Sequence, residues 1–282
     1  MNELQPPMPM PPLFWRWLQA RGFKSKEQVT EFLAPRLGEI KNPFVLKDMA
    51  AACSRLELAL ATQEPVCVYG DYDLDGSTGI ALLVNGLRQL GFKNVSYYQP
   101  SRFLEGYGIH ADALEKIAAR GDRLVVSVDC GITAVDEALK AKALGLDLII
   151  TDHHLPRETL PEALAVINPN SGKCESGLGY LSGVGVAFYL LMALKSRVGR
   201  ADVDLKKLLD FFVIGTLTDM VPLKKENRVL VKHGLVQLSR TDKPGLRALL
   251  KKLELWGREL ESQDVGFTLA PKLNALSRLE LG

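Results

Sequence analysis

The chain has 282 residues, of which 47% are hydrophobic and 24% are charged, and its formal net charge is +2. This composition is typical of a globular protein with a large core, the weak charge alone does not predict nucleic-acid binding, and the four widely spaced cysteines exclude a zinc ribbon or a disulfide framework. No apolar run approaches the roughly 18 residues of a membrane span, and residues 1–12 lack a signal-peptide core, so we expect no membrane association and a cytoplasmic location.

The first 45 residues are expected to form a tail followed by short helices. One helix is predicted over Leu13–Ala20, and a second begins at a capping box formed by Ser25 and Gln28. Trp15 and Trp17 of the first helix either pack against neighbours or provide a stacking platform for nucleic acid, and packing is the commoner fate of such residues.

Short apolar runs alternate with helical stretches from residue 66 onward, after a helix that Asp48 is expected to cap and that ends near Ala61. The alternation predicts an α/β fold with a doubly wound parallel sheet, a small helical N-terminal element and a helical C-terminal connector. The predicted strands are Val66–Tyr69, Val95–Tyr98, Leu124–Val128, Leu146–Ile150 and Leu164–Ile167, and the predicted helices between them are Gly79–Leu90, Ala111–Ala119 and Ala134–Leu144.

Three alternating carboxylates, Asp71, Asp73 and Asp75, follow the first predicted strand. Repulsion between carboxylates this close destabilises a fold unless a cation lies among them, so a divalent metal site is the leading interpretation. An EF-hand begins with the same pattern, but it requires a Glu at its twelfth position, where this chain has Leu82. A solvated acidic turn without a ligand is the other alternative.

Polar side chains also follow the other predicted strands. Arg102 and Glu105 come after the second strand, Asp129 after the third, and the triplet Asp152–His154 after the fourth. Because the carboxyl ends of parallel strands lie at one edge of a sheet, where ligands bind, we expect these separate clusters to converge in space.

A glycine-rich turn at residues 179–185 precedes an apolar helix that is predicted to extend to about Lys195. The turn does not follow a strand, and Phe188 occupies the place of the third glycine of a dinucleotide fingerprint, which argues against that motif. The turn is either a nest of backbone N–H groups for a phosphate or a simple tight turn.

Asp219 follows the next apolar helix, which is predicted over Leu205–Leu217. A carboxylate within an apolar segment requires a partner, which makes Asp219 a candidate metal ligand. Further helices are predicted over Arg228–Leu238 and, in a basic segment, over Lys243–Trp256.

These carboxylates and imidazoles, without a thiolate, favour Mn²⁺ or Mg²⁺ over structural zinc, and the imidazoles favour Mn²⁺. About five such ligands can hold two cations roughly 3.5–4 Å apart, an arrangement that promotes hydrolysis of a phosphodiester or phosphoanhydride. We expect His153 to bind metal, His154 to give a hydrogen bond or proton to a phosphate oxygen, and Arg102 to contact phosphate.

Eight motifs between Phe44 and Arg278 occur in an order and spacing typical of one family. They are Gly70–Gly76, Ser101–Gly108, Val128–Ile132, Thr151–His154, Ile167–Asn170, Ser182–Phe188, Gly215–Leu223 and Leu269–Ala275. In these motifs the sequence resembles the DHH-family phosphoesterases, and among them most closely the bacterial RecJ single-strand-specific exonucleases. The resemblance implies 5′ to 3′ release of nucleotides from single-stranded DNA in recombination and repair, with two Mn²⁺ or Mg²⁺ ions as cofactors.

The same resemblance implies roles for individual residues. The implied metal ligands are Asp73, Asp75, Asp129, His153 and Asp219, with Asp129 bridging. His154 and Asp71 are the implied catalytic residues, Asp71 lying beside the metals as a ligand or a close neighbour. The implied substrate-binding residues are Arg102, Glu105, Tyr107, Ser182 and Gly183. Tyr69 stands where many members have a metal-binding His, so we expect one ion to be held more weakly or Asp71 to substitute.

Departures from the family pattern concern the C-terminal part. Family exonucleases continue into a DHH-associated domain and an oligonucleotide-binding domain, and Ser277 replaces a glycine of the family motif. We therefore expect a truncated catalytic core with a weakened hold on substrate, divided into an N-terminal element (1–45), a catalytic domain (46–238) and a connector (239–282). Single-stranded DNA is the expected partner, with a single-strand-binding protein and a helicase as further candidates. A phosphoesterase for small substrates (pyrophosphate, a dinucleotide or a short oligonucleotide) and a non-catalytic scaffold of the same fold are the alternatives.

Overall fold

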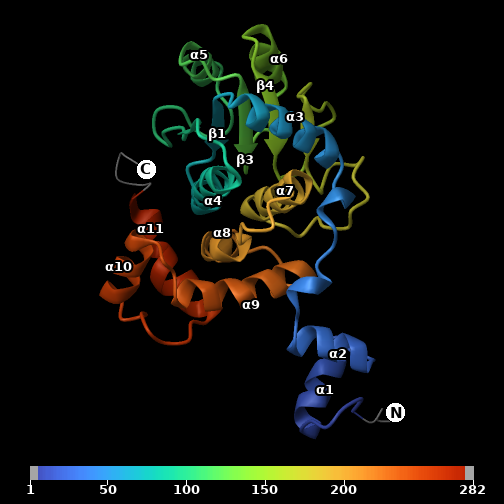
Figure 1. The fold of residues 1–282 in the computed structure, drawn as a ribbon. Coiled ribbons are helices and arrows are strands. Elements are labelled where there is room, and N and C mark those ends of the chain that lie inside the picture. Colours follow the sequence, from blue (N-terminus) through green and yellow to red (C-terminus); the bar gives the residue numbers. More distant parts are fainter. Residues whose placement is uncertain (1–5, 277–282) are drawn as a thin grey trace.

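The computed structural model describes residues 6–276, which form a parallel sheet flanked by helices (Figure 1). The sheet has five strands in the order β2-β1-β3-β4-β5, and every neighbouring pair is parallel. The strands are β1 (Val66–Gly70), β2 (Val95–Tyr98), β3 (Leu124–Val128), β4 (Asp147–Thr151) and β5 (Ala165–Ile167), which agrees with the prediction to within one residue at each end.

Side chains along each strand alternate between two apolar layers. On β1, Val66 and Val68 belong to one layer, whereas Cys67 and Tyr69 belong to the other. One face of the sheet is covered by α3 (Met49–Thr62), α4 (Leu74–Leu90) and α7 (Gly183–Val198), and the other by α5 (Ala111–Ala119) and α6 (Val135–Ala143). Helices on both faces of a parallel sheet confirm the predicted doubly wound α/β fold.

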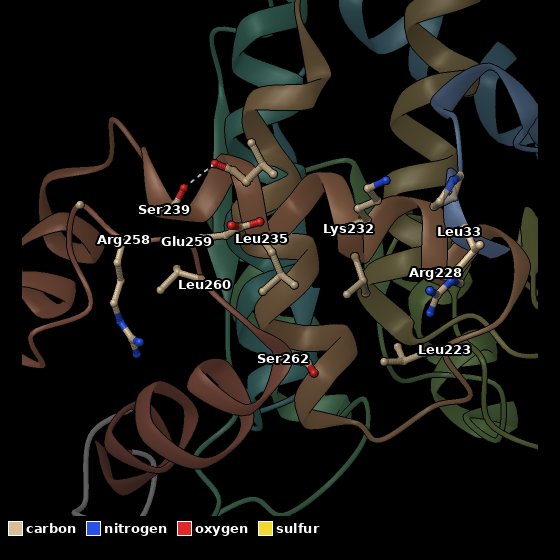
Figure 2. Close-up of a pocket in the computed structure, with 14 residues that line it drawn as sticks. Leu33, Leu223, Arg228, Lys232, Leu235, Ser239, Arg258, Glu259, Leu260 and Ser262 are labelled. Carbon is tan, nitrogen blue, oxygen red and sulfur yellow. Dashed lines mark hydrogen bonds between the residues drawn. The ribbon is translucent and has the colours of Figure 1, made fainter. Parts of the chain in front are cut away.

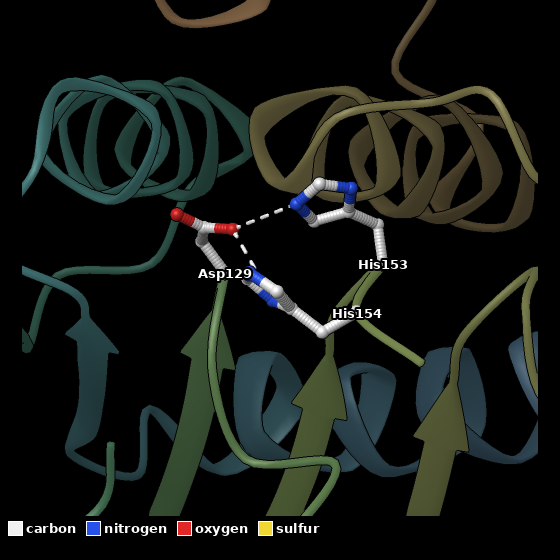
Figure 3. A group of neighbouring side chains, drawn as sticks. All are labelled: Asp129, His153 and His154. Carbon is white, nitrogen blue, oxygen red and sulfur yellow. Dashed lines mark ion pairs between the residues drawn. The ribbon is translucent and has the colours of Figure 1, made fainter. Parts of the chain in front are cut away.

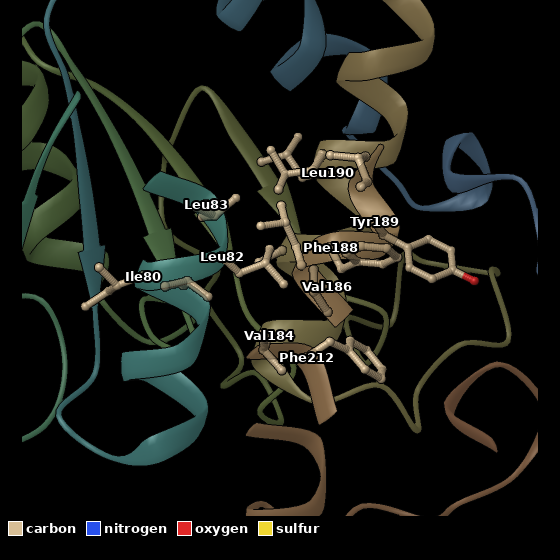
Figure 4. Close-up of a cluster of buried hydrophobic side chains, with 14 of the residues drawn as sticks. Ile80, Leu82, Leu83, Val184, Val186, Phe188, Tyr189, Leu190 and Phe212 are labelled. Carbon is tan, nitrogen blue, oxygen red and sulfur yellow. The ribbon is translucent and has the colours of Figure 1, made fainter. Parts of the chain in front are cut away.

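The apolar layer that contains α3, α4 and α7 continues beyond the sheet, where α4 packs against α7 and α8 (Leu209–Thr218) (Figure 4). Leu83 and Phe212 are fully buried there, and burying such a side chain stabilises the fold by about 1.5–3 kcal/mol. Gly86 permits the close approach of α4 and α7, because a Cβ at this position would lie 2.2 Å from Cδ1 of Leu191. This packing fixes α4 and α7 relative to the sheet edge that carries the acidic residues.

Helix α4 begins at Leu74 rather than at the predicted Gly79. Asp73 is the N-cap residue and accepts a hydrogen bond from the N–H of Gly76 at 3.0 Å, while Asp75 lies in the first turn. The predicted start was wrong because an Asp N-cap and an acidic first turn stabilise a helix start that a glycine and polar residues would otherwise weaken.

Asp48 precedes α3 as expected, but its side chain does not cap the helix. Its backbone is left-handed (φ 61°), and its carboxylate accepts a hydrogen bond from the N–H of Val166 at 3.2 Å. Asp48 therefore ties the start of α3 to β5, a contact between residues far apart in the sequence.

The N-terminal element has its own small apolar cluster. The predicted capping box at Ser25 is confirmed. Trp15 is 4% exposed, and Trp17 stacks on Phe14 with ring centroids 5.6 Å apart and lies under the guanidinium of Arg21 at 3.7 Å. These contacts favour packing over a free stacking platform. The element comprises α1 (Pro12–Ala20), α2 (Lys26–Leu33), η1 (Leu37–Glu39) and η2 (Pro43–Val45).

The chain after the sheet is helical. Besides α7 and α8 it forms η3 (Leu205–Leu208), α9 (Lys225–Ser239), α10 (Pro244–Lys252), a π-helical segment η4 (Asp264–Leu269) and α11 (Ala270–Leu276). The helix expected over 205–217 is thus a 3₁₀ turn followed by an α-helix, and the helix expected to reach Trp256 ends at Lys252.

Ser277 lies outside the described residues, and the predicted division into three parts stays a prediction. Within residues 6–276, no helix combines the length and apolar character that crossing a membrane would demand.

Candidate metal centre

The strand order reverses between β1 and β3, and ligands bind at this point in open α/β sheets. Asp71 follows β1 directly, Asp129 follows β3 directly, and His153 follows the end of β4. Figure 3 shows Asp129 facing His153 and His154 above the carboxyl ends of the strands. The expected convergence of separate sequence clusters at one sheet edge is therefore present in the fold.

Asp129 lies at the centre of the cluster. Its Oδ1 atom is 3.2 Å from Nε2 of His153 and 3.9 Å from Nδ1 of His154. The same Nε2 atom of His153 is 3.9 Å from Oδ2 of Asp75 and 3.5 Å from Oδ2 of Asp219. Within residues 6–276, three groups of side chains are close enough to hold an ion: Asp129 with His153 and His154; Asp75 with His153 and Asp219; and Asp71 with Asp73 and Asp129.

Several buried polar atoms of this cluster lack a hydrogen-bond partner. They are Oδ1 of Asp71, Oδ1 of Asp129, Nε2 of His153 and Oδ2 of Asp219. Buried polar atoms are nearly always paired, so atoms that converge without partners indicate a missing ligand. Carboxylate oxygens with an imidazole nitrogen and no thiolate are a donor set suited to Mn²⁺ or Mg²⁺. The residues present therefore fit divalent cations.

Burial and mutual repulsion raise the carboxyl pKa values in the cluster. Burial, with the charge of Asp73, raises the pKa of both Asp71 and Asp219 to about 6. Burial also raises the pKa of Asp75 and of Asp129 well above the usual range, and the nearby carboxylates add to the effect. Bound cations would offset this repulsion, because an opposite charge favours the ionised carboxylates.

Burial has the opposite effect on His153, whose pKa it lowers to about 4. The imidazole is therefore neutral at physiological pH. Neutral imidazole is the form that binds metal, because the ring nitrogen must offer a lone pair.

The first turn of α7 holds the carboxylate of Asp75. The N–H of Gly183 donates to Oδ2 at 2.6 Å, and the N–H of Val184 donates to Oδ1 at 3.0 Å. The N–H of Gly185 donates to Oγ of Ser182 at 3.3 Å, and Ser182 is fully buried. These N–H groups are thus already engaged, which favours the simple tight turn over the phosphate nest, and the substrate-binding roles of Ser182 and Gly183 stay predictions. The helix start binds a carboxylate of the protein instead.

Gly183 also makes room for Asp129. A Cβ at Gly183 would lie 2.5 Å from both Cβ and Oδ1 of Asp129. Asp129 itself has a left-handed backbone (φ 62°), and its N–H donates to the carbonyl of Thr151 at 3.0 Å. A non-glycine residue in this conformation costs on the order of 1–3 kcal/mol, which the surrounding fold must offset. The strained turn directs the carboxylate into the cluster.

Asp152 orients His154. The Oδ1 atom of this fully buried carboxylate accepts a hydrogen bond from Nδ1 of His154 at 2.8 Å. Although burial raises it, the pKa of Asp152 is lowered overall, chiefly by the hydrogen bond from His154, and the same hydrogen bond raises the pKa of His154. A carboxylate only accepts, so Nδ1 carries the ring proton and Nε2 is the second functional atom.

Two asparagines support the loop that carries both histidines. The side-chain amide of Asn168 donates to the carbonyl of His154 at 2.9 Å, and that of Asn170 donates to the carbonyl of His153 at 2.5 Å. The sequence motifs include these asparagines and Asp152, but no role was predicted for any of the three. The available signal was a polar turn directly after the fifth predicted strand, at the same sheet edge.

The loop Ser101–Gly108 contains the three other predicted substrate-binding residues, Arg102, Glu105 and Tyr107, and they differ in their surroundings. Glu105 accepts hydrogen bonds from the hydroxyl of Tyr98 at 2.6 Å and from the N–H of Ser101 at 2.7 Å, so it shapes the loop rather than facing a ligand. Arg102 is exposed, with its guanidinium 5.3 Å from the ring of Tyr72, which lies beside the acidic segment. Arg102 and Tyr107 are exposed, and the substrate-binding roles of all three residues stay predictions.

Tyr107 reaches the cluster with its hydroxyl, which donates to the carbonyl of Asp129 at 3.2 Å and lies 3.1 Å from Nδ1 of His154. Tyr69 does not reach it. Tyr69 is fully buried on the other face of the sheet, and its hydroxyl donates to the carbonyl of Gly108 at 2.9 Å. Asp71, two residues further on, is the side chain that enters the cluster from the end of β1.

Residues 65–216 match the N-terminal domain of the DHH family. The chain belongs to the DHH family. Among curated relatives of this DHH chain, the single-stranded-DNA-specific exonuclease RecJ of Bacillus subtilis is 42% identical over 269 residues, which cover 95% of this chain and 33% of the relative. The RecJ exonuclease of Salmonella typhimurium is 38% identical over 287 residues, covering 97% of this chain and 48% of the relative.

Two solved structures are similar throughout the fold. A crystal structure of exonuclease RecJ bound to manganese has a TM-score of 0.75 and 37% identity, covering 84% of this chain and 59% of that one. RecJ from Thermus thermophilus in complex with Mn²⁺ has a TM-score of 0.76 and 35% identity, covering 93% of this chain and 36% of that one. The family resemblance seen in the motifs is confirmed, and the DHH chain spans a third to about a half of the length of these curated relatives.

Proposed function

We propose that this DHH chain is the catalytic core of a metal-dependent phosphoesterase that releases nucleotides from single-stranded DNA in the 5′ to 3′ direction. The supporting observation is the carboxylate of Asp129, which belongs to two of the three candidate ion-holding groups and has an unpaired buried oxygen. The similar RecJ proteins are named as single-stranded-DNA-specific exonucleases, and two of their solved structures hold manganese.

The residues that would hold the two ions are Asp73, Asp75, Asp129, His153 and Asp219, with Asp129 between them and Asp71 beside them. Bound there, Mn²⁺ or Mg²⁺ supplies positive charge at the phosphate and makes a water molecule more acidic. The chain contributes a neutral His153, and a carboxylate of Asp75 that is kept in place by the two N–H groups of α7.

His154 is the proposed proton donor. Its ring edge contacts Tyr107 with centroids 5.6 Å apart, and Asp152 holds the Nδ1 proton, so the ring has one orientation and one tautomer. The hydrogen bond to Asp152 raises the pKa of His154, which favours the form that carries a second proton. In that form His154 can donate from Nε2 to a phosphate oxygen or to the leaving oxygen.

The loop Ser101–Gly108 favours a polymeric substrate over a small one. Phe103 is 62% exposed and Leu104 is 88% exposed, next to the exposed cation of Arg102. Apolar and aromatic side chains beside a cation suit bases and phosphates of a single strand, whereas pyrophosphate offers nothing for the apolar side chains to contact.

The test is hydrolysis of single-stranded DNA labelled at either end, in the presence of Mn²⁺. We expect mononucleotides to appear from the 5′ end, no cleavage of a duplex, and no reaction with a chelator present. Hydrolysis of pyrophosphate or dinucleotides alone would instead indicate a small-substrate enzyme. A chain that binds Mn²⁺ but hydrolyses no phosphodiester would indicate a scaffold.

A cytoplasmic location and contacts with a single-strand-binding protein and a helicase are part of the same proposal. The proposed substrate supports both partners, because a single-strand-binding protein covers single strands and a helicase generates them. It supports the location only as the place where such DNA occurs.

A further inference from the structure

Positive charge is concentrated at the start of α9, apart from the acidic metal centre. Two cavities of about 700 and 580 Å³ adjoin there and share Leu223 and Arg228 in their walls. Lys224 and Lys225 line one cavity and Lys232 lines the other, and none of the proposed metal ligands lines either. Figure 2 shows Arg228 between Leu33 and Leu223, on the side of α9 that faces the larger cavity.

Arg228 has no anionic partner within the part of the chain that the structure describes. Its Nε atom donates to the carbonyl of Phe32 at 2.7 Å, and its guanidinium lies over the ring of Phe32 at 3.6 Å. These contacts fix the side chain and leave its terminal N–H groups without an acceptor among residues 6–276. Burial lowers the pKa of Arg228 and no carboxylate offsets the effect. A fixed, planar guanidinium with free N–H groups is suited to a bidentate contact with phosphate.

The N-terminus of α9, a helix of 15 residues, adds to this arrangement. Lys224 is the N-cap residue and forms no capping hydrogen bond, and Lys225 is the first helical residue. The free N–H groups of a helix start attract anions and repel cations, so Glu226 in the first turn is favourable there and the two lysines are not. The ammonium of Lys224 contacts only the ring of Tyr180, at 5.1 Å, and that of Lys225 contacts no partner in the described chain.

The acidic residues in the same cavity do not neutralise these cations. Glu226 accepts hydrogen bonds from the hydroxyl of Tyr180 and from the N–H of Lys41. Glu39 accepts one from the N–H of Arg36 at 3.2 Å. With Glu31 these are three acidic residues of that cavity against five basic ones (Arg21, Lys41, Lys224, Lys225 and Arg228), which leaves a net positive charge. The positive charge at the start of α9 is thus available to a ligand.

We propose that Lys224, Lys225, Arg228 and Lys232, the α9 basic site, bind the phosphate backbone of a DNA single strand whose end lies in the metal centre. The proposal rests on the proposed function. Lys224 follows Asp219 by five residues, which span at most about 18 Å when extended, so one strand can reach both sites with few intervening nucleotides. Phe23 and Phe32 line the same cavity and offer apolar rings next to the cations.

The test replaces Lys224 and Lys225 together by Glu. The matched control is Lys93→Glu together with Arg123→Glu, which reverses two exposed cations before β2 and β3, at the amino edge of the sheet, opposite the metal centre. Fluorescence anisotropy with labelled oligothymidylates of increasing length, without divalent ions, measures binding without hydrolysis. We expect the double variant to lose roughly tenfold or more in affinity for long strands at low salt, and its salt dependence to fall by about 0.7 per lost phosphate contact. The control should bind as the wild type does.

A second readout separates this site from the metal centre. Hydrolysis of a dinucleotide with Mn²⁺ should keep its kcat and KM in the double variant, because a dinucleotide does not reach α9. Arg228→Lys should bind long strands more weakly than the wild type, since it keeps the charge but loses the bidentate donor pair.

Unchanged binding of long strands by the double variant would overturn the inference. Equally tight binding of inorganic phosphate or a mononucleotide would show a small-anion site instead, and competition by polyglutamate as strong as that of an oligonucleotide of equal charge would show a site for acidic protein. A wild-type chain that binds long strands through these residues but hydrolyses none would contradict the proposed function and leave this inference standing.

Discussion

Nε2 of His153 and Oδ1 of Asp129 face each other across 3.2 Å, and both atoms are buried without a hydrogen-bond partner. The residues follow the neighbouring strands β4 and β3, so the sheet itself sets their separation. Such a pair requires a cation or a proton between its members. One proton between His153 and Asp129 would leave the buried oxygens of Asp71 and Asp219 without partners, whereas divalent cations would satisfy all of these atoms and are the better fit.

Asp129→Asn should abolish tight metal binding and hydrolysis while the chain stays folded. Asn has nearly the same shape and tolerates the left-handed backbone at this position, whereas it removes the charge common to two ion-holding groups. We expect Mn²⁺ affinity to fall at least about 100-fold, beyond the usual effect of residues that only support a ligand. Calorimetry and circular dichroism on the same samples measure both effects. Full activity in a folded variant would remove Asp129 from the site.

Gly183→Ala should weaken metal binding, and Gly185→Ala, two residues along the same helix, should not. A Cβ at Gly183 would lie 2.5 Å from Oδ1 of Asp129, whereas the nearest atoms to a Cβ at Gly185 would lie at 3.4 Å, an ordinary contact. Both changes remove a glycine from a helix, which by itself stabilises the helix by up to about 1 kcal/mol. Mn²⁺ titration of the two variants isolates the displacement of Asp129, and equal affinities would show that the carboxylate moves aside without consequence.

The carboxyl groups of Asp71 and Asp219 should make the metal-free chain less stable as the pH rises from about 4 to about 7, whereas His153, with a pKa lowered to about 4, contributes in the opposite direction. Burial raises the pKa of Asp71 and Asp219 to about 6, so the folded chain binds protons more tightly than the unfolded chain does in this range. The contribution is fully present below the unfolded pKa and is lost as the pH passes the folded pKa. For Asp71 alone it amounts to at most about 3 kcal/mol.

Urea unfolding of the metal-free chain at several pH values tests this expectation. Asp71→Asn should be more stable than the wild type at pH 8 and no more stable at pH 4, while the exposed control Glu162→Gln should show no such difference. Mn²⁺ should stabilise the wild type more at pH 8 than at pH 5. An Asp71→Asn variant without a pH-dependent difference would show that the carboxylate is better solvated than its burial indicates.

Asp152→Asn should lower the pKa of His154 and reduce hydrolysis roughly 10- to 100-fold, because Asp152 accepts the Nδ1 proton that fixes the tautomer. The hydrogen bond to Asp152 is the main cause of the raised pKa of His154, so its loss should shift the imidazole titration to lower pH. NMR titration of the His154 ring in the metal-free chain checks the shift. A drop in hydrolysis with an unchanged titration would assign Asp152 a purely structural role.

The strands were predictable from the sequence, because buried parallel strands are continuous apolar runs. The polar residues that follow them were predictable as one site, because the carboxyl ends of parallel strands meet at one edge of the sheet. The run Leu124–Val128 and the following Asp129 illustrate this, since both the strand bounds and the place of the carboxylate agree with the structure. The first turn of α4 was not predictable from periodicity, because it carries no apolar stripe. Its acidic residues form the N-cap, at Asp73, and part of the metal centre, at Asp75.

The parts of the site that the sequence did not predict depend on tertiary contacts. That the N–H groups of Gly183 and Val184 bind Asp75 rather than a phosphate follows from the packing of α7 against α4, more than 100 residues away in sequence. The burial of Tyr69 on the opposite face follows from the alternation along β1. A continued strand would place Asp71 on the same face as Tyr69, yet Asp71 lies in the metal centre. The strand ends at Gly70, so the alternation does not continue to Asp71.

The most direct test of the central claim is electron paramagnetic resonance of the chain titrated with Mn²⁺, together with equilibrium dialysis. The account predicts two Mn²⁺ ions per chain with the signal of a spin-coupled pair, since two-metal sites hold their ions roughly 3.5–4 Å apart, and it predicts loss of that coupled signal in Asp129→Asn. A single uncoupled Mn²⁺ per chain, or a coupled pair that persists in Asp129→Asn, would contradict a two-metal site centred on Asp129.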